Sequence, residues 1–308
     1  MGRQTVRRVY SRQLTKVGAI FTADFVDPRT LPGLHRVLEI ATARPVKRLG
    51  QNFLVAPDQF DRIADAVVKT QPQWVLEIGP GPGGLTCALL ERGLQVLAVE
   101  IDPTWVNWLT STLVPRYPTT LRILQQDALI MSWKTLEVGR DRPWTVCGNL
   151  PYYITSPLMA KFFEDASSWN AAVLMVQKEV AARLLADPGQ RNTSALSVLL
   201  RYVATIRGLG EVSRHQFYPS PEVDSFVIQL TRSPSPAIPL EHLRGVVQAA
   251  FRHRRKMIRQ SLAQVSGPAW NSHEWARILT EEGIDPSKRA EALSWSEWIK
   301  LARLAGKK

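Results

Sequence analysis

The sequence predicts an α/β fold in which a doubly wound sheet is followed by a small C-terminal domain made only of helices. Patterns typical of strands span residues 74–78, 95–99, 121–124 and 144–148. Helical patterns follow these runs at residues 85–92, 103–114 and 155–163. Regular alternation of this kind indicates βαβ units and a parallel sheet. After a Ser-Pro linker at residues 233–236, residues 240–304 show only helical periodicity, which predicts the second domain.

Three regions are expected along the chain. They are a basic extension at residues 1–27, a Rossmann-like domain at 28–234 and a helical domain at 235–308. The Rossmann-like domain begins with a weakly helical stretch and ends with further strand and helix patterns, at residues 28–43, 171–176, 178–186 and 225–230. The extension is rich in Arg and holds no acid before Asp24, so it suits either a flexible basic arm or a transit peptide.

Composition narrows the class of protein. With 308 residues, 45% of them hydrophobic, the chain can bury a full core. Its apolar runs are all shorter than the roughly 18 residues needed to span a bilayer, so we expect no membrane segment. Cys87 and Cys147, the two cysteines, both stand in apolar contexts. They predict buried thiols in a reducing compartment and exclude a cysteine-based zinc site; with five scattered histidines, we expect no metal.

The net charge of +12 is concentrated at the two ends of the chain. Residues 1–50 carry ten Lys/Arg and three Asp/Glu, a balance of +7, and residues 241–308 carry thirteen and seven, a balance of +6. Residues 51–240 carry sixteen and seventeen, a balance of −1. A neutral middle with basic ends predicts a catalytic core with polyanion-binding flanks, although a solvated basic surface gives the same count.

A glycine turn opens the nucleotide-binding unit. Residues 79–84, Gly-Pro-Gly-Pro-Gly-Gly, follow the first strand, and Glu100 ends the second strand. The glycines allow close backbone approach to a ligand, and the acid can accept both hydroxyls of a ribose. The spacing alone does not separate S-adenosylmethionine from NAD. Glu77 inside the strand, and two prolines in a turn that NAD would need for its pyrophosphate, favour the methyl donor.

Two more strand ends carry polar residues. Asp127 follows the third strand, where it could bind an adenine amino group or cap a helix. Asn149-Leu150-Pro151-Tyr152 follows the fourth, and these residues indicate either a Pro turn or a corner that grips a planar, amine-bearing ring. All of these positions fall at strand carboxyl ends, where α/β sheets bind ligands.

Two features outside the sheet edge suit nucleic acid. Phe217 lies in a Pro- and aromatic-containing loop at residues 213–221, where it can stack on a base or anchor the core. Residues 252–259 carry five cations, which on a helix would attract phosphates. These expected RNA-binding residues are Arg252, Arg254, Arg255, Lys256 and Arg259.

These motifs together resemble the ribosomal RNA adenine N6-dimethyltransferases, and more specifically the bacterial enzymes that act on 16S rRNA. The resemblance covers nearly everything from about residue 45 onward, whereas residues 1–27 have no counterpart. The matching segments are residues 47–54, 75–86, 99–102, 148–157, 177–184, 213–225, 251–262 and 287–294. The resemblance implies a Rossmann-like S-adenosylmethionine-dependent methyltransferase fold, without a metal. One departure is Gln126, since the family often has Gly before the Asp at position 127.

The resemblance also implies roles for single residues. The donor would be bound by Gln51, Asn52, Leu54, Gly79, Gly81, Glu100, Ile101, Asp127, Ala128 and Asn149. Catalysis would rest on Asn149, Leu150, Pro151 and Tyr152. Tyr152 and Phe217 would sandwich the extruded adenine. Hydrogen bonds from the adenine amine to the Asn149 side chain and to the carbonyl of Leu150 or Pro151 would orient it for attack on the donor methyl.

The implied reaction is dimethylation of two adjacent adenosines near the 3′ end of 16S rRNA, in the 30S subunit or its precursor. The implied protein is a cytoplasmic monomer with a role in ribosome biogenesis. Three other functions stay open from sequence. They are a DNA adenine N6-methyltransferase, a 23S rRNA adenine N6-methyltransferase and a non-catalytic RNA-binding assembly or transcription factor.

Overall fold

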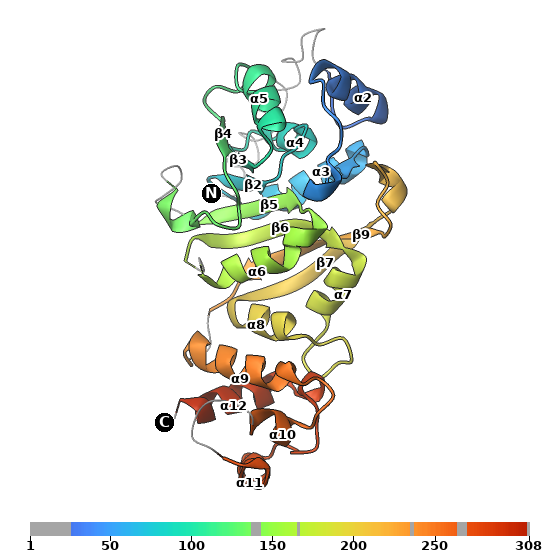
Figure 1. Ribbon diagram of the computed structural model, residues 1–308. Helices are drawn as coiled ribbons and strands as arrows, with labels where there is room; N and C mark the ends of the chain where they lie inside the picture. Colours follow the sequence, from blue (N-terminus) through green and yellow to red (C-terminus); the bar gives the residue numbers. More distant parts are fainter. Residues whose placement is uncertain (1–25, 137–142, 165–166, 235–236, 264–269, 307–308) are drawn as a thin grey trace, which may run out of the picture. The chain divides into compact units, whose positions relative to one another are not determined.

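The computed structural model describes residues 26–136, 143–164, 167–234, 237–263 and 270–306 (Figure 1). The basic extension expected at residues 1–27 lies almost wholly outside these ranges. The chain divides into two compact units, one of Met1–Lys178 with Gly208–Leu230, the other of Glu179–Arg207 with Thr231–Lys308. The second unit includes residues 179–207 because α8 (Ala195–Val203) packs on α9 (Leu240–Arg252). The compact units therefore do not follow the expected boundary at residue 235, which stays a prediction.

A seven-stranded sheet forms the centre of the fold (Figure 1). Its order is β4 (Leu121–Gln125), β3 (Val96–Glu100), β2 (Val75–Ile78), β5 (Trp144–Asn149), β6 (Trp169–Gln177), β9 (Ser225–Arg232) and β7 (Ala204–Val212). The pairs from β4 to β6 are all parallel, with Val75 opposite Val96 on one side and Thr145 on the other. The order reverses between β2 and β5, so the predicted doubly wound sheet is confirmed.

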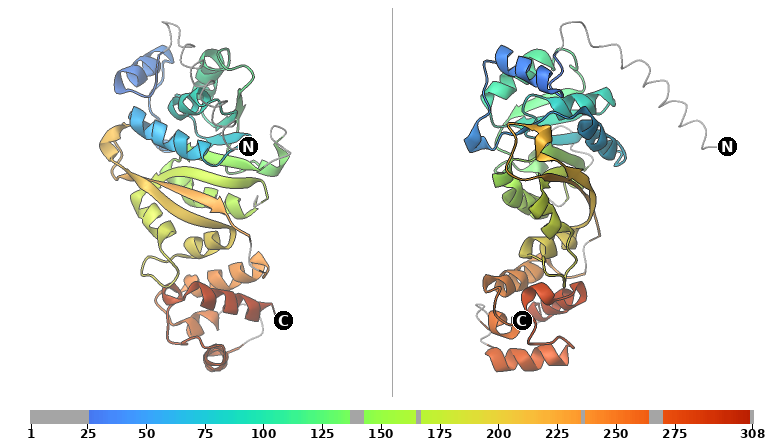
Figure 2. Two further views of the ribbon diagram at one scale, coloured as in Figure 1. Left: turned by 180° about the vertical axis from the view of Figure 1, so that it is seen from behind. Right: turned by 90° about the vertical axis from the view of Figure 1, so that its right-hand side faces the viewer.

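Helices cover both faces of this sheet (Figures 1 and 2). One face packs against α3 (Pro57–Val68), α4 (Gly84–Glu91) and α5 (Pro103–Thr112), whose apolar residues share one cluster with alternate strand residues such as Val75 and Cys147. The other face carries α6 (Thr155–Glu164). There Phe162 meets Trp133 and Trp169 edge to face, at centroid distances of 5.2 and 4.8 Å. Burial of these rings fixes the layers on which the strand ends are placed.

A smaller assembly lies beside the sheet edge. It consists of α2 (Leu31–Ile40) and of the antiparallel pair β1 (Phe53–Leu54) and β8 (Phe217–Tyr218). Arg29 ties the start of α2 to α4 through a salt bridge of 2.7 Å to Glu91. The short 3-10 turns of the chain are η1 (Lys47–Leu49), η2 (Trp133–Thr135), η3 (Tyr152–Ile154), η4 (Arg214–Gln216) and η5 (Ala290–Ala292).

After residue 239, the described residues of the second unit (240–263 and 270–306) form helices and turns, in agreement with the all-helical C-terminal part of the predicted fold class. Besides α8 and α9 it contains α7 (Lys178–Leu185, of which Lys178 belongs to the first unit), α10 (Ile258–Leu262), α11 (Ser272–Glu281) and α12 (Trp295–Ala305). The prediction that the cationic run at 252–259 lies on a helix is wrong. Helix α9 ends at Arg252 and α10 starts at Ile258, so Arg254, Arg255 and Lys256 occupy the turn between them.

Sequence patterns alone do not identify every element. Helix α3 starts at Pro57 and buries Phe60, Ile63 and Val67 at helical spacing, yet it is absent from the predicted elements. Helix α8, with its capping box between Ser194 and Ser197, and strand β7 are absent from them too. Cys87 and Cys147 are buried, as predicted. In the part of the chain that the structure describes, no helix is long and apolar enough to cross a membrane.

Candidate active site

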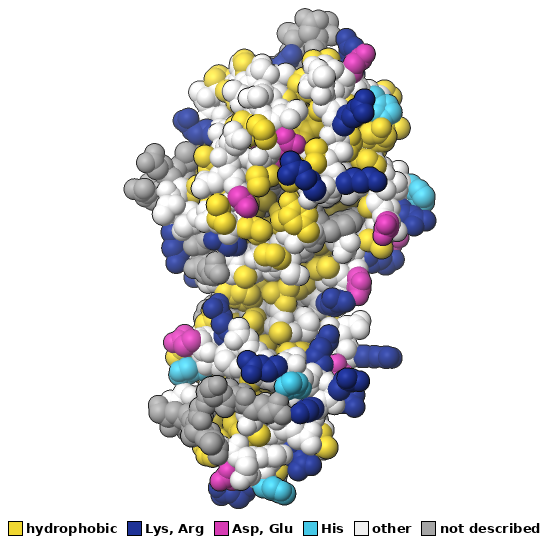
Figure 3. Space-filling view, in the orientation of Figure 1, with side chains coloured by type: hydrophobic (Ala, Val, Ile, Leu, Met, Phe, Trp, Pro, Cys, Tyr) yellow, Lys and Arg dark blue, Asp and Glu magenta, His cyan; other side chains and the backbone are white. Residues whose placement is uncertain are grey.

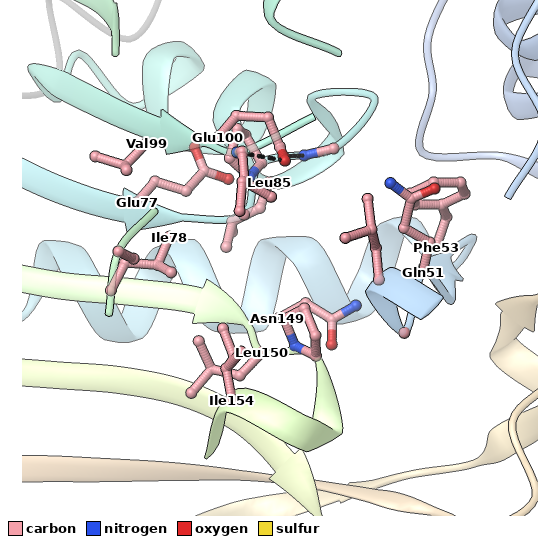
Figure 4. A pocket seen from close by; sticks show the side chains of 18 of the residues that line it. Gln51, Phe53, Glu77, Ile78, Leu85, Val99, Glu100, Asn149, Leu150 and Ile154 are labelled. Atoms are coloured by element: carbon pink, nitrogen blue, oxygen red, sulfur yellow. Dashed lines mark hydrogen bonds between the residues drawn. The ribbon is translucent and has the colours of Figure 1, made fainter. Parts of the chain in front are cut away.

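The ends of β2, β3, β4 and β5 line one pocket (Figure 4). Parallel neighbours place their carboxyl ends at the same edge, so motifs far apart in sequence meet there. Thirteen of the residues expected to bind the donor, catalyse transfer or stack on the base line it: Gln51, Asn52, Leu54, Gly79, Gly81, Glu100, Ile101, Asp127, Ala128, Asn149, Leu150, Pro151 and Phe217. The convergence predicted from the sequence is therefore present in the fold.

The glycine turn under the pocket has a backbone that other residues adopt poorly. Gly79, Gly81 and Gly83 have φ angles of 67°, 53° and 95°, in the left-handed region. A Cβ on Gly81 would also lie 3.1 Å from the ring of Phe53, which forms one wall of the pocket. The glycines thus let the Phe53 ring pack against the backbone of the turn.

Glu100 is fixed at the pocket edge by backbone donors. Its carboxylate accepts N–H groups from Gly81 at 3.0 Å and from Ile101 and Asp102 at 2.9 Å each. Burial raises the pKa of Glu100, and these hydrogen bonds oppose the rise. The Gly81 N–H is therefore directed at a carboxylate and not at a phosphate. A buried acid at this point disfavours a pyrophosphate and suits the uncharged hydroxyls of a ribose.

Glu77 lies inside β2 and lines the same pocket, with only 1% of its surface exposed. The Thr86 hydroxyl donates to its carboxyl at 2.7 Å. Burial raises the pKa of Glu77 from 4.5 to about 8, although the Thr86 hydrogen bond acts in the opposite direction. The acid that the sequence places inside an apolar strand is therefore protonated near neutral pH.

Glu77 should make stability depend on pH. Between pH 4.5 and about 8 the folded chain holds a proton at Glu77 that the unfolded chain has lost. The contribution of this proton to the free energy of unfolding is complete below pH 4.5 and is lost as pH rises through 8. The loss is up to about 1.4 kcal/mol per pH unit. We expect the free energy of unfolding of Glu77→Gln, measured in urea from about pH 5 to about pH 8, to lack this dependence on pH. Glu39→Gln, at an exposed carboxylate, should keep it; equal slopes for Glu77→Gln and wild type would contradict the assignment.

Gln51 is held by protein groups in the structure. Its carbonyl accepts the Val46 N–H at 2.9 Å, and its amide donates to Asp102 at 2.8 Å. Asp102 also caps α5 by accepting the Thr104 N–H at 2.9 Å. The side chain thus pins the segment before β1 to the end of β3, and its expected contact with the donor stays a prediction.

Asp127 does not cap a helix, which was one of its two predicted roles, because residues 128–130 form a turn. One carboxylate oxygen accepts the Leu129 N–H at 2.8 Å. A carboxylate has a second oxygen, so this bond does not exclude binding of an adenine amine. Asp127 lines the pocket beside Ala128, so binding of an adenine amine is compatible with its position and stays a prediction.

The orientation of Asn149 is set by one hydrogen bond. Its Nδ2 donates to the backbone carbonyl of Asn52 at 3.1 Å. An amide has a donor end and an acceptor end, so use of the donor end leaves Oδ1 as the group presented to a ligand (Figure 4). The side chain therefore offers an acceptor at the end of β5.

The backbone carbonyls of Leu150 and Pro151 differ in whether they can still accept a hydrogen bond from a ligand. The Pro151 carbonyl accepts the Ile154 N–H at 3.1 Å and the Thr155 hydroxyl at 3.4 Å, which uses both of its lone pairs. The Leu150 N–H donates to Met175 of β6 at 3.2 Å, which holds the corner against the sheet. Of the two carbonyls expected to meet the target amine, Leu150 is thus the one suited to a ligand.

The aromatic residues expected to stack on a base are placed unequally. Phe217 lines the pocket, but it is 5% exposed and belongs to the hydrophobic core cluster, so its anchoring role is observed. The side chain of Tyr152 lies outside what the structure describes. Tyr153, which no sequence motif singled out, lines the pocket and is 53% exposed. Phe53 was missed as well, although it stands inside the segment 51–54.

These features together define an S-adenosylmethionine-dependent methyltransferase. They are a Rossmann-like sheet with a glycine turn, a buried acid at the end of β3 in place of a phosphate site, and an Asn-Leu-Pro corner at the end of β5. Comparison with known proteins agrees. The family "Ribosomal RNA adenine dimethylase" matches residues 43–305. The chain is 38% identical over 281 residues to "Ribosomal RNA small subunit methyltransferase A" of Novosphingobium aromaticivorans, covering 90% of this chain and 99% of that protein. The chain belongs to the ribosomal RNA adenine dimethylase family and is a methyltransferase.

Other similar proteins also align with most of this chain. The protein of the same name from Thermobifida fusca is 35% identical over 287 residues, covering 91% of this chain and 98% of that protein. A dimethyladenosine transferase of Plasmodium falciparum shares the fold, with a TM-score of 0.68 and 24% identity over 83% of this chain and 98% of that one. The 23S rRNA methyltransferase ErmE has a TM-score of 0.64 and 26% identity over 83% of this chain and 100% of that one.

Proposed function

We propose that this protein dimethylates N6 of two adjacent adenosines near the 3′ end of 16S rRNA, with S-adenosylmethionine as donor, during biogenesis of the small ribosomal subunit. The observation that carries the proposal is the fixed acceptor oxygen of Asn149 at the edge of the pocket formed by Glu100, Asp127 and the glycine turn. The similarity to small-subunit methyltransferases supports the choice of RNA.

The residues of the pocket fit this donor. When bound, S-adenosylmethionine supplies an electrophilic methyl group on a sulfonium sulfur. Glu100 would accept hydrogen bonds from the ribose hydroxyls, and the second oxygen of Asp127 would accept one from the adenine amine. The glycine turn would pass beneath the donor. Gln51, Asn52 and Leu54 would line its methionine end. Transfer of this kind needs no metal.

The acceptor corner would bind the amine of the target adenosine. N6–H groups would donate to Oδ1 of Asn149 and to the carbonyl of Leu150, which favours a pyramidal nitrogen with its lone pair directed at the methyl. Tyr152 and Phe217 would hold the ring, which must leave its stack to reach the pocket. The rate then comes mainly from positioning, because no covalent intermediate is formed. A second round requires that the corner accept a monomethylated amine.

The turn between α9 and α10 would bind RNA phosphates. Arg252 at the end of α9 and Arg255 and Lys256 in the turn are exposed, and Lys and Arg are grouped over the C-terminal helices on the face shown in Figure 3. Arg254 is partly structural, because its guanidinium lies 5.9 Å from the Phe251 ring and donates to Thr193 at 3.3 Å. The protein would act as a cytoplasmic monomer on the 30S subunit or its precursor.

Neutralising the exposed cations should weaken binding to 30S particles. We expect a triple change to Gln at Arg252, Arg255 and Lys256 to lower the slope of log affinity against log salt by about 2 to 3, because each phosphate that a cation neutralises adds about 0.7 to 0.9 to this slope. Filter binding over a range of salt concentrations measures it. A matched triple change at Arg277, Arg289 and Arg303 should leave the slope unaltered. Equal slopes for both variants would contradict the phosphate-binding role.

Substrate choice tests the proposed function against its alternatives. Labelled donor should transfer methyl groups to 30S particles. Transfer only to protein-free 23S RNA would indicate the 23S methyltransferase instead, and transfer to duplex DNA a DNA adenine methyltransferase. Binding to 30S particles without any transfer would indicate the non-catalytic factor.

A further inference from the structure

A second groove lies in the same compact unit, beside the donor pocket. It encloses about 980 Å³, within the size range of pockets that bind small molecules and large enough for a nucleotide. Its walls come from α2 and the turn after it, from the segment 50–52, and from the loop after β8. None of the roles assigned above uses α2 or this loop.

The groove shares one wall with the donor pocket. Gly50, Gln51 and Asn52 line both the groove and the donor pocket. The carbonyl of Asn52 is the group that orients the Asn149 amide, at 3.1 Å. A ligand in the groove would therefore lie on the other side of the segment that sets the acceptor oxygen.

Tyr218 provides an aromatic surface on the groove wall. Its backbone is fixed by pairing of β8 with β1, where it stands opposite Phe53. Its ring meets His35 of α2 edge to face, at a centroid distance of 4.7 Å and an angle of 77°, and 36% of the residue remains exposed. Pro219 and Pro221 follow it along the wall. A fixed, exposed ring next to apolar prolines suits stacking with a nucleobase.

Two cations and two acids line the groove, so its formal charges balance. Arg44 and Lys47 are at least partly exposed, as are Glu39 and Glu222. Glu39 is paired with Arg36, a residue of the same helix that lies outside the lining. Arg44 and Lys47 therefore present two cations beside the aromatic wall, and cations next to an aromatic surface suit single-stranded nucleic acid.

We propose that this groove holds the nucleotide next to the target adenosine, with its base stacked on Tyr218 and its phosphate neutralised by Arg44 and Lys47. The proposal rests on the proposed function and specifies its substrate as a single-stranded segment of at least two nucleotides. For adjacent target adenosines, the groove would hold one while the corner binds the amine of the other.

Binding of a fluorescent hexaadenylate RNA, measured by anisotropy with S-adenosylhomocysteine present, tests the groove in the full chain. Tyr218→Ala should weaken binding about tenfold, because it removes the ring on which the base stacks, whereas Tyr218→Phe should bind as wild type does. The double change to Ala at Arg44 and Lys47 should lower the salt slope by about 0.7, the contribution of one phosphate. A double change at the exposed cations Lys69 and Arg122, outside both cavities, should not.

Failure of the groove proposal is separable from failure of the proposed function. Absence of hexamer binding by the wild type, or equal affinity for Tyr218→Ala and wild type, overturns the groove. Dependence of binding on Tyr218 in a protein that transfers no methyl group to 30S particles would uphold the groove and overturn the function. With both correct, Tyr218→Ala should raise KM for 30S particles about tenfold while kcat stays near wild type.

Discussion

Replacement of Asn149 by Ala is expected to abolish methyl transfer to 30S particles while donor binding survives. The change removes the oriented Oδ1 acceptor and leaves the Asn52 carbonyl without its donor. Loss of one preorganised group at a reacting centre costs about 100- to 1,000-fold in kcat. Loss of the amide also removes the restraint on the segment 50–52, so the effect should reach the upper part of that range.

Single-turnover transfer from labelled donor measures this loss, and calorimetric titration with S-adenosylhomocysteine measures donor binding. Asn107→Ala serves as the matched control, because Asn107 is an exposed residue of α5 that lines neither cavity. Near-normal turnover by Asn149→Ala would remove the proposed acceptor role. Loss of donor affinity equal to the loss of turnover would place Asn149 in donor binding alone.

Gly148→Ala should be nearly as damaging, for a steric reason. A Cβ on Gly148 would lie 2.4 Å from the carbonyl oxygen of Ile78 in the neighbouring strand β2. Both atoms are fixed by the sheet, so β5 must shift and carry Asn149 with it. Overpacking of this kind costs about 1 to 3 kcal/mol in stability. A displacement of about 1 Å in a catalytic group lowers the rate by about 100-fold.

Thermal unfolding and the same transfer assay test this variant. Gly245→Ala in α9 is the control, since a Cβ there meets nothing within 4 Å and Ala is the better helix residue by about 1 kcal/mol. It should keep or gain stability and keep full activity. Wild-type stability and turnover in Gly148→Ala would show that the close approach of β5 and β2 does not set the position of Asn149.

The sheet and its ligand edge could be predicted because each strand end carries a chemical signal. The turn at 79–84, Glu100, Asp127 and Asn149 all stand at or just after the carboxyl end of a strand, and parallel pairing brings such ends together. Helix α3 was harder, because its sequence combines apolar residues with Asp58, Asp61 and Asp65, and only burial of one face against the sheet identifies it.

The sequence does not predict which groups form hydrogen bonds with each other. The Pro151 carbonyl accepts hydrogen bonds from Ile154 and Thr155, which leaves the Leu150 carbonyl for a ligand, and no sequence pattern indicates this. The cationic run after α9 was placed on a helix because periodicity continues through it, whereas α9 ends at Arg252 and a turn follows. The groove beside Tyr218 joins α2 to a loop about 180 residues later, an arrangement set only by the tertiary fold.

Mass spectrometry of nucleosides from 16S rRNA tests the central claim most directly. Undermethylated 30S particles are incubated with the protein and isotopically labelled S-adenosylmethionine, and the RNA is then digested. The expected result is label in N6,N6-dimethyladenosine, from two adjacent positions near the 3′ end, and none with Asn149→Ala. Absence of labelled dimethyladenosine, or label confined to another base or to 23S rRNA, would contradict the account.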